Sequence, residues 1–311
     1  MSDANCWYVV VNPVSGGGRA RRYWPQLRMA LDRKRVPYRS TESTAAGVAS
    51  ETVAGALRDG HRHFLALGGD GSFHQLINGL MSQQQLPLTG LLCGVAPVGS
   101  GNDWARALGI PADPAQLAAV MSDCRSRYVD LGFVTCTEPG GNGRLTVAFH
   151  NGVGAGLDAA AVRRIPASGP RAIAYLVGLA RAMRGFEAPR FEVRAGGQFI
   201  VGSCLAVIAA NGPTCGGGMR LAPAARHDDG FLDVILFDRI GLWRAATLVP
   251  GLYNGRAVRD RAVRTIRCHE ALITSDPPCD VEADGQLIGR TPLSVRIQPA
   301  SLQVLDCRGN R

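Results

Sequence analysis

The chain has 311 residues, of which 46% are hydrophobic and 19% are charged, a composition typical of a globular protein. Its length is about twice that of an average domain, so we expect two domains and exclude a small scaffold stapled by disulfides or metals. The formal net charge of +9 favours anionic partners such as nucleotides or anionic lipids. Nucleic acid is not an expected partner, because the chain has neither zinc-finger spacing nor basic runs interleaved with aromatic residues.

The cysteines and the N-terminal residues indicate the cellular compartment in which we expect the protein. The nine cysteines are scattered and form no C-x-x-C pair, so neither a zinc site nor a disulfide framework is predicted. The first residues lack the basic segment of a signal peptide. No apolar stretch approaches the roughly 20 residues of a spanning helix. We therefore expect a cytoplasmic protein with reduced thiols that meets a membrane, if at all, at its surface.

The first 125 or so residues alternate between strand and helix patterns. Apolar runs predict strands at 6–13, 36–43, 63–69 and 91–99. Helical patterns between them lie near 21–33, where Pro25 limits the start, at 45–60, at 73–80 and at 102–110. Strands separated by helices of this length predict parallel βαβ units.

From about Tyr128 the pattern changes to short β-type runs separated by glycine and proline turns. Two helices interrupt these runs, near 171–184 and 240–255, and residues 137–144 predict a hairpin tip. A second domain with antiparallel sheet is therefore expected. The predicted strands are 128–136, 144–154, 190–196, 199–212, 230–237, 270–275, 293–299 and 302–307.

Three glycine-containing loops follow predicted strands of the first domain, at residues 11–20, 68–72 and 97–103. Ligands of parallel α/β sheets bind at the carboxyl ends of the strands, and glycine lets main-chain N–H groups approach phosphate oxygens closely. Three such loops predict a phosphate-rich ligand. A P-loop is excluded because Lys34, the only lysine, has no G-K-[ST] context, and no G-x-G-x-x-G follows the first strand.

Asp70 is the unexpected residue of these loops, because a carboxylate repels phosphate. It fits there if a divalent cation lies between them, or if it polarises an incoming hydroxyl during phosphoryl transfer. The alternative interpretation is a helix N-cap for the turn that follows.

Six motifs resemble those of the diacylglycerol kinase catalytic-domain superfamily, which includes bacterial lipid kinases and sphingosine kinases. They occur in the family's order and span nearly the whole chain. The motifs are "NPVSGGG", "LGGDGSFHQLINGL", "PVGSGNDWARALGIP", "NGVGAGLDAAAV", "NGPTCGGGMRLAPAARHDDGFLDV" and "EADGQLIG".

The resemblance implies an α/β protein of two domains. An NAD-kinase-like, parallel-sheet nucleotide-binding domain would comprise residues 1–127 with about 295–311. A β-sandwich with the metal site and the lipid-acceptor region would comprise residues 128–294. The cofactors implied are ATP and Mg²⁺. By the same resemblance the nucleotide would contact Asn12, Ser15, Gly16, Gly17, Thr41, Gly68, Gly69, Gly71, Ser72, Gly99, Ser100, Gly101 and Asn102.

The resemblance also assigns catalytic and metal-binding roles. Asp70 would be the central carboxylate, and a magnesium ion would be held by Asp229 and the carbonyls of Arg226 and Phe231. A plain hairpin turn is the alternative for residues 228–230. The family's last motif ends in a glutamate that accepts the hydroxyl proton, but Gln286 stands here.

A neutral amide cannot act as that proton acceptor. Residues 282, 284 and 286 would share one face of a regular strand, so Glu282 or Asp284 could substitute, or Asp70 could suffice. Our catalytic candidates are therefore Asp70, Asp284 and Gln286.

The expected activity is an ATP-dependent lipid kinase that phosphorylates a hydroxyl of diacylglycerol or a related lipid, within lipid metabolism and phospholipid biosynthesis. Its partners would be nucleotide and lipid at an anionic membrane surface, with a homodimer left open. The apolar stretch 173–183 and its flanking arginines are candidates for transient docking on the inner membrane face, or are simply core with a solvated rim. Two alternatives are a nucleotide-binding regulatory protein that has lost activity through Gln286, and a kinase of a soluble acceptor such as NAD.

Overall fold

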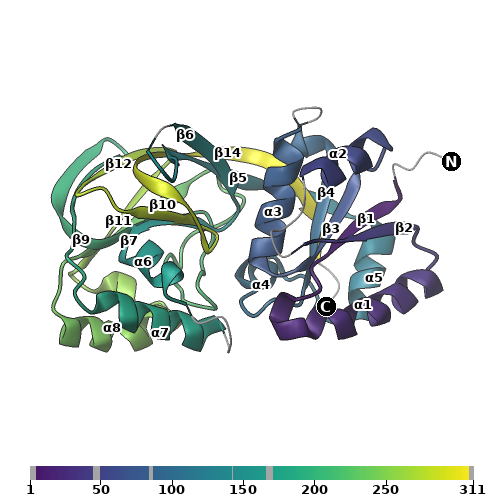
Figure 1. The fold of residues 1–311 in the computed structure, drawn as a ribbon, viewed down its shortest axis with the longest axis horizontal. Helices are drawn as coiled ribbons and strands as arrows, with labels where there is room; N and C mark the ends of the chain where they lie inside the picture. Colours follow the sequence, from purple (N-terminus) through teal and green to yellow (C-terminus); the bar gives the residue numbers. More distant parts are fainter. Residues whose placement is uncertain (1–4, 45–49, 84–86, 142, 166–170, 308–311) are drawn as a thin grey trace. The chain divides into compact units, whose positions relative to one another are not determined.

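A computed structural model describes residues 5–44, 50–83, 87–141, 143–165 and 171–307. The chain divides into two compact units. Unit 1 comprises Met1–Val129 and Ala300–Arg311, and unit 2 comprises Asp130–Pro299. The first division lies two residues after the boundary expected from the sequence. Strands β5 and β14 each run from one unit into the other (Figure 1).

Unit 1 is built on a parallel sheet in the order β14-β4-β3-β1-β2. Its central strands are apolar runs whose residues are buried on both faces, as is typical of parallel sheets covered by helices. The expectation that the C-terminal run returns to this unit is confirmed, because Gln303 pairs with Leu92. The strands are β1 (Trp7–Val11), β2 (Tyr38–Glu42), β3 (His63–Gly68), β4 (Leu92–Pro97) and the end of β14 (Gln286–Leu305).

The helices of unit 1 connect these strands. In this unit α1 packs against α5, and α2 packs against α3 (Figure 1). The regular part of the helix expected near 21–33 begins just after Gly18, whose φ is positive, and it contains Pro25, so the proline does not limit it as predicted. The sequence pattern also missed α5, which Asp113 caps by accepting the N–H of Gln116. The helices are α1 (Ser15–Arg33), α2 (Ser50–Arg58), α3 (Asp70–Met81), η2 (Leu88–Gly90), α4 (Asp103–Leu108) and α5 (Pro114–Asp123).

Unit 2 is a β-sandwich whose two layers share the long strands β9 and β14. One layer runs β11-β10-β9-β7-β13-β14, and in the other β8 pairs with β9 and β12, β12 pairs with β14, and β5 pairs with β14 and β6. Alternating residues of both layers form one apolar core. The strands are β5 (Ser126–Thr137), β6 (Arg144–Phe149), β7 (Gly152–Gly156), β8 (Arg190–Ala195), β9 (Gln198–Ala210), β10 (Leu232–Asp238), β11 (Val263–Cys268), β12 (Glu270–Asp276), β13 (Asp280–Ala283) and β14.

The described residues of unit 2 also form three α-helices and one short helix. Helices α7 and α8 lie where the sequence predicts them, whereas α6 lies in a stretch for which no helix was expected. The tip at 137–144 is confirmed, since Thr137 pairs with Arg144. The helices are α6 (Leu157–Arg163), α7 (Arg171–Met183), α8 (Leu242–Asn254) and η3 (Ala257–Arg259).

The turn between β13 and β14 contradicts one expectation from the sequence. Residues 282, 284 and 286 do not lie on one regular strand, because Asp284 and Gly285 turn the chain between β13 and β14. Both residues have positive φ, +50° and +82°. Asp-Gly is the dipeptide that favours such two-residue hairpin turns. The face-sharing argument that placed Asp284 beside Gln286 therefore fails.

The main chain at Gly69 lies very close to the main chain at Gly99 in unit 1, and this close approach can be tested. A Cβ added to Gly99 would lie 2.4 Å from the Cα of Gly69, where no side chain can move aside. We expect Gly99→Ala to lower the free energy of unfolding by about 1–3 kcal/mol, as overpacking does. Urea denaturation followed by circular dichroism measures the change.

Gly90→Ala is the matched control, because an added Cβ there meets nothing within 4 Å. Its free energy of unfolding should stay within about 0.5 kcal/mol of the wild type. Equal losses in the two variants would contradict the close crossing of residues 69 and 99.

Candidate functional site

The three glycine loops of unit 1 follow β1, β3 and β4, which are neighbours in the sheet. Direct hydrogen bonds join them. The Nδ2 of Asn12 donates to the Oγ of Ser72 at 3.1 Å, the N–H of Val98 donates to the carbonyl of Gly68 at 2.9 Å, and Arg19 donates to the carbonyl of Gly99 at 2.9 Å. The structure thus brings together the loops that the sequence suggested would converge.

The first loop owes its shape to consecutive glycines. Gly16, Gly17 and Gly18 have φ values of +63°, +67° and +85°, a region that residues with a Cβ rarely adopt. A Cβ on Gly17 or Gly18 would meet nothing within 4 Å, so conformation rather than space calls for glycine there. Ser15, the first residue of α1, donates its N–H to the carbonyl of Asn12. Main-chain atoms therefore dominate this loop's surface, as a phosphate-binding loop requires.

Asp70 links the second and third loops. Its carboxylate accepts the N–H groups of Asp103 at 3.0 Å and Trp104 at 3.3 Å, at the start of α4. The N-cap of α3 is Gly69, so the idea that Asp70 caps its own helix is wrong. The carboxylate serves the neighbouring helix instead, which fixes its position at the loop cluster.

The remaining nucleotide candidates lie on β2, on α3 and in the segment between β4 and α4. Asn102 adopts a left-handed conformation with φ +55° and donates to the carbonyls of Pro97 and Gly99. Thr41 lies on β2 opposite Val10, next to the start of the first glycine loop. Gly71 and Ser72 lie in the first turn of α3, and Ser100 and Gly101 lie between β4 and α4. That these residues contact nucleotide remains a prediction.

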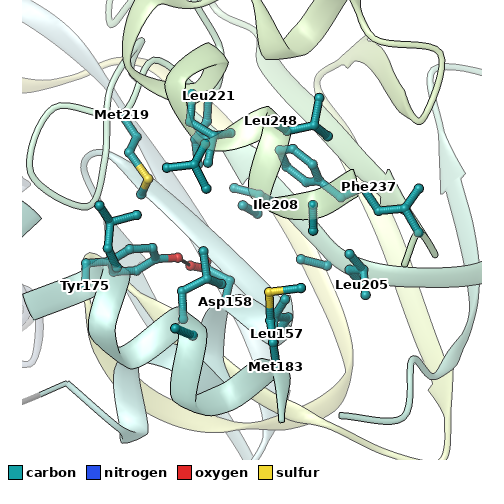
Figure 2. Close-up of a pocket in the computed structure, with 18 of the residues that line it drawn as sticks. Leu157, Asp158, Tyr175, Met183, Leu205, Ile208, Met219, Leu221, Phe237 and Leu248 are labelled. Carbon is teal, nitrogen blue, oxygen red and sulfur yellow. Dashed lines mark hydrogen bonds between the residues drawn. The ribbon is translucent and has the colours of Figure 1, made fainter. Parts of the chain in front are cut away.

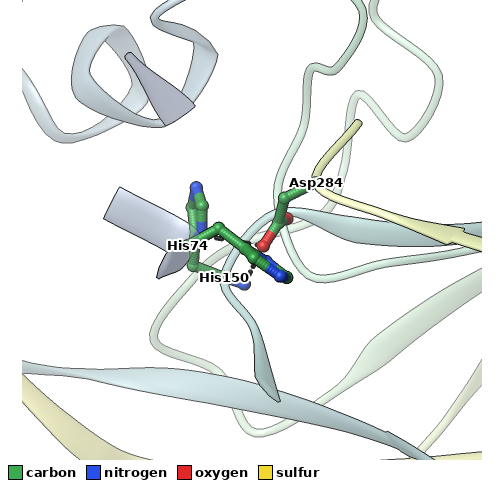
Figure 3. Close-up of side chains that lie close together, drawn as sticks. All are labelled: His74, His150 and Asp284. Carbon is green, nitrogen blue, oxygen red and sulfur yellow. Dashed lines mark hydrogen bonds and ion pairs between the residues drawn. The ribbon is translucent and has the colours of Figure 1, made fainter. Parts of the chain in front are cut away.

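In unit 2, Asp284 is held by main-chain groups. Its carboxylate accepts the N–H groups of His150, Asn151 and Gly152 at 2.9–3.2 Å. The Nδ1 of His150 lies 2.8 Å from the Oδ2 of Asp284, and both side chains are buried (Figure 3). These contacts anchor the 150–152 turn, and the catalytic role of Asp284 remains a prediction, as does that of Gln286, the first residue of β14.

The residues expected to bind magnesium lie in the loop before β10. Asp229 accepts the N–H of Phe231 at 3.1 Å with one oxygen, and its other oxygen lies 2.6 Å from the Nη2 of Arg267. A guanidinium thus occupies the place of a cation beside this carboxylate. The donor set does not fit a divalent ion in this arrangement.

The sequence did not reveal a buried acidic pair in unit 2. Asp158 and Glu282 are 6% and 7% exposed, and they hydrogen-bond to each other. The hydroxyl of Tyr175 donates to the Oδ1 of Asp158, and the N–H of Gly285 donates to Glu282 at 2.7 Å. Two buried carboxyls in hydrogen-bond contact cannot both ionise cheaply, so one proton is shared between them.

Burial dominates the pKa values of these groups. Burial raises the pKa of Glu282, and the neighbouring Asp158 raises it further. Burial likewise raises the pKa of the Asp158 carboxyl. Burial and then Asp158 raise the pKa of Tyr175, so its phenol stays protonated and donates.

Asp158 and Tyr175 lie at the polar corner of an apolar pocket within unit 2 (Figure 2). The pocket has a volume of about 440 Å³ and lies among α6, α7, α8 and the sheet. Such a cavity suits an apolar chain with one hydrogen-bonding group. Its apolar wall includes Leu157, Leu205, Ile208, Met219, Phe237 and Leu248.

Comparison with known proteins identifies the family of this chain. Residues 6–134 match the diacylglycerol kinase catalytic domain. Residues 151–306 match the YegS C-terminal NAD kinase beta sandwich-like domain. The chain belongs to this family of diacylglycerol and YegS-like lipid kinases, as the motifs predicted.

Individual relatives agree. The "Probable lipid kinase YegS-like" protein of Pseudomonas aeruginosa is 32% identical over 269 residues, covering 83% of this chain and 81% of that protein. A diacylglycerol kinase of Mycobacterium tuberculosis is 27% identical over 303 residues, covering 96% and 94%. A solved diacylglycerol kinase from Bacillus anthracis str. Sterne shares the fold, with a TM-score of 0.71 at 17% identity over 98% and 97% of the chains.

The acidic pair predicts an unusual pH dependence of stability. The folded state keeps a proton that the unfolded chain releases, so the free energy of unfolding should fall as pH rises above the ordinary glutamate pKa. The fall is up to about 1.4 kcal/mol per pH unit until the folded-state pKa is reached. Glu282→Gln should flatten this slope above about pH 5.

Urea denaturation at several pH values measures both slopes, with Glu192→Gln as the control at an exposed glutamate of β8. The control should keep the wild-type slope. A wild-type slope that Glu282→Gln leaves unchanged would show that the pair does not share a proton.

Proposed function

We propose that the protein is an ATP-dependent lipid kinase that transfers the γ-phosphate to a hydroxyl of a diacylglycerol-like lipid. The observation that carries the proposal is the largely apolar pocket with hydrogen-bonding groups of Asp158 and Tyr175 at one corner. A soluble acceptor such as NAD offers no aliphatic chain for such a wall. Membership of a kinase family supports the phosphotransfer step.

ATP, entering as its magnesium complex, would supply the phosphoryl group. Main-chain N–H groups of the loops at 15–18, 68–72 and 99–102 would hold its phosphates, since phosphoryl transfer depends chiefly on positioning and electrostatic stabilisation. Asp70, fixed by the N–H groups of Asp103 and Trp104, would act as the carboxylate at these phosphates. The chain's own contribution is thus a preorganised cradle.

The acceptor would lie with its apolar chain along the wall of the pocket. The carboxyl pair of Asp158 and Glu282 holds a proton, so the polar corner can both donate to and accept from a lipid's hydroxyl or ester groups. Sharing one proton leaves the pair with one negative charge instead of two, which lowers the cost of burying it beside an aliphatic chain. These properties favour an uncharged lipid such as diacylglycerol.

The lipid must be taken from a bilayer, and no helix within the described ranges combines the length and hydropathy of a membrane-crossing segment. We propose transient docking on the anionic inner face of the membrane, with arginines near α6 and α7 facing the headgroups. Arg163, Arg164, Arg181 and Arg184 lie in these helices or within one residue of their ends. A homodimer is part of the same proposal.

The second candidate is a nucleotide-binding protein without transfer activity, and the observation that favours it is Gln286. One assay separates the candidates: transfer of labelled γ-phosphate to diacylglycerol, other hydroxyl lipids and NAD, with the lipids in vesicles with and without anionic lipid. We expect phosphorylated diacylglycerol, more with anionic lipid and less at high salt.

Asp70→Asn should lower transfer by at least about 10²-fold. The control is Asp113→Asn, because asparagine caps a helix about as well as aspartate and should leave activity unchanged. ATP binding without transfer, rescued by Gln286→Glu, would establish the second candidate. Phosphorylated NAD would overturn the lipid proposal.

The pocket has its own test, because filling it should exclude the acyl chain. Ala180→Phe places a ring at a pocket-lining position of α7 and should lower kcat/KM for long-chain diacylglycerol by about tenfold or more. ATP affinity should not change, and shorter acyl chains should lose less.

Val177→Phe is the matched control, since it adds a ring to the same helix at a position that does not line the pocket. Equal effects of Ala180→Phe on long and short acyl chains would contradict an acyl-binding pocket.

A further inference from the structure

The loop that leads into β10, residues 226–231, is closed by contacts from the protein itself. The N–H of Gly230 donates to the Oδ2 of Asp130 at 2.6 Å, and Asp130 donates its own N–H to the carbonyl of His227 at 2.7 Å. The carbonyl of Gly230 lies 2.8 Å from the Nδ1 of His269. Two residues of unit 2 outside the loop, Asp130 and His269, therefore make polar contacts with its main chain.

Asp229 faces a fixed cation. Its Oδ2 lies 2.6 Å from the Nη2 of Arg267, and its Oδ1 accepts the N–H of Phe231. The Asp229 side chain is 17% exposed, so this carboxylate is largely withdrawn from water. A withdrawn carboxylate needs a counter-charge, and Arg267 supplies one.

Two further contacts hold Arg267 in this position. The guanidinium carbon of Arg267 lies 4.3 Å from the centroid of the Phe231 ring. The same ring stacks against the ring of His269, with 4.3 Å between the two centroids. Arg267 also pairs in register with Asp233 across strands β11 and β10. Strand pairing, a cation–π contact and an ion pair thus act on one side chain.

A divalent cation has different requirements. Mg²⁺ in proteins binds one or two carboxylates and keeps several waters in octahedral geometry. At Asp229 a guanidinium lies at hydrogen-bond distance from one oxygen, and a main-chain N–H occupies the other. A second cation there would be repelled by the first.

We propose that Arg267 takes the place of a divalent cation at Asp229, so that the 226–231 loop holds its shape without metal. Arg267 of strand β11 supplies the positive charge that a bound ion would bring to the loop. This inference does not rest on the proposed lipid kinase activity, because it concerns the folding of one loop.

The experiment is thermal unfolding of the full chain, without nucleotide, in EDTA and in MgCl₂ at millimolar concentration. The melting temperature of the wild type should be the same in both. Arg267→Met should melt lower in EDTA, by about 2–4 °C. Mg²⁺ should restore part of that loss, because the uncovered carboxylate can then bind the ion.

Arg264→Met is the matched control: Arg264 is another arginine of β11 and pairs with Asp238. It should lose stability to a similar extent without any response to Mg²⁺. Arg267→Lys keeps a positive charge and should also not respond. Mn²⁺ binding, followed by electron paramagnetic resonance, gives a second readout that is independent of melting.

Two results would overturn the proposal. One is a wild-type protein that binds Mn²⁺, or gains melting temperature with Mg²⁺, and loses that response in Asp229→Asn. The other is an Arg267→Met variant whose melting temperature ignores Mg²⁺. Should Arg267→Met fail to fold, the wild type and Asp229→Asn still decide the first question, and metal binding by Arg267→Gln, which also removes the charge, decides the second.

Discussion

A carboxylate that accepts main-chain N–H groups from a distant segment is the interaction on which the functional parts of this protein depend. Asp70 accepts from the start of α4, 33 residues away. Asp284 accepts from the 150–152 turn, 134 residues before it for His150, and Asp130 accepts from Gly230, 100 residues on. The bonds of Asp70 and Asp130 fix loops that carry candidate site residues, and those of Asp284 fix the turn before β7. Glycine-rich loops have few side chains of their own to hold them, so such anchors decide their shape.

This arrangement changes how the catalytic candidates are understood. A carboxylate that anchors a loop is preorganised, and preorganisation is the main contribution that a protein can make to phosphoryl transfer. The structural role of Asp70 therefore does not compete with the catalytic role that we propose for it. At Asp284 the balance differs, because three N–H groups and His150 surround a carboxylate that is fully buried. Asp284 orders the turn where β7 begins.

Local patterns made much of the fold predictable. The apolar runs of β1, β3 and β4 and the glycines after them determine strands and loops within a few residues, and the parallel order then brings the loops to one edge. The prediction failed where the local signal was ambiguous. Pro25 lies inside α1, and the Asp284–Gly285 turn interrupts what resembled a continuous strand.

The acidic pair and the Arg267 contact were beyond the reach of the sequence. Asp158 and Glu282 are separated by more than a hundred residues and meet only because β7 pairs with β13. Arg267 is one of many arginines, and its partner is set by the register of β11 on β10. Contacts of this kind follow from long-range pairing, for which a single sequence carries no periodic signal.

Two carboxylate sites of unit 2 differ in what offsets their charge, and the difference follows from what each place must hold. At Asp158 and Glu282 the neighbouring space is an apolar pocket, so a permanent cation beside them would be desolvated along with them, and a shared proton is the less costly solution. At Asp229 the surroundings include solvent, and the guanidinium of Arg267 is half-exposed, so a cation can serve without full desolvation. A carboxyl pair that shares a proton can both donate to and accept from an uncharged lipid group, whereas the ion pair suits a loop that keeps its shape. The kind of counter-charge, proton or guanidinium, therefore separates the part of the sandwich fit to bind an apolar ligand from the part that supports it.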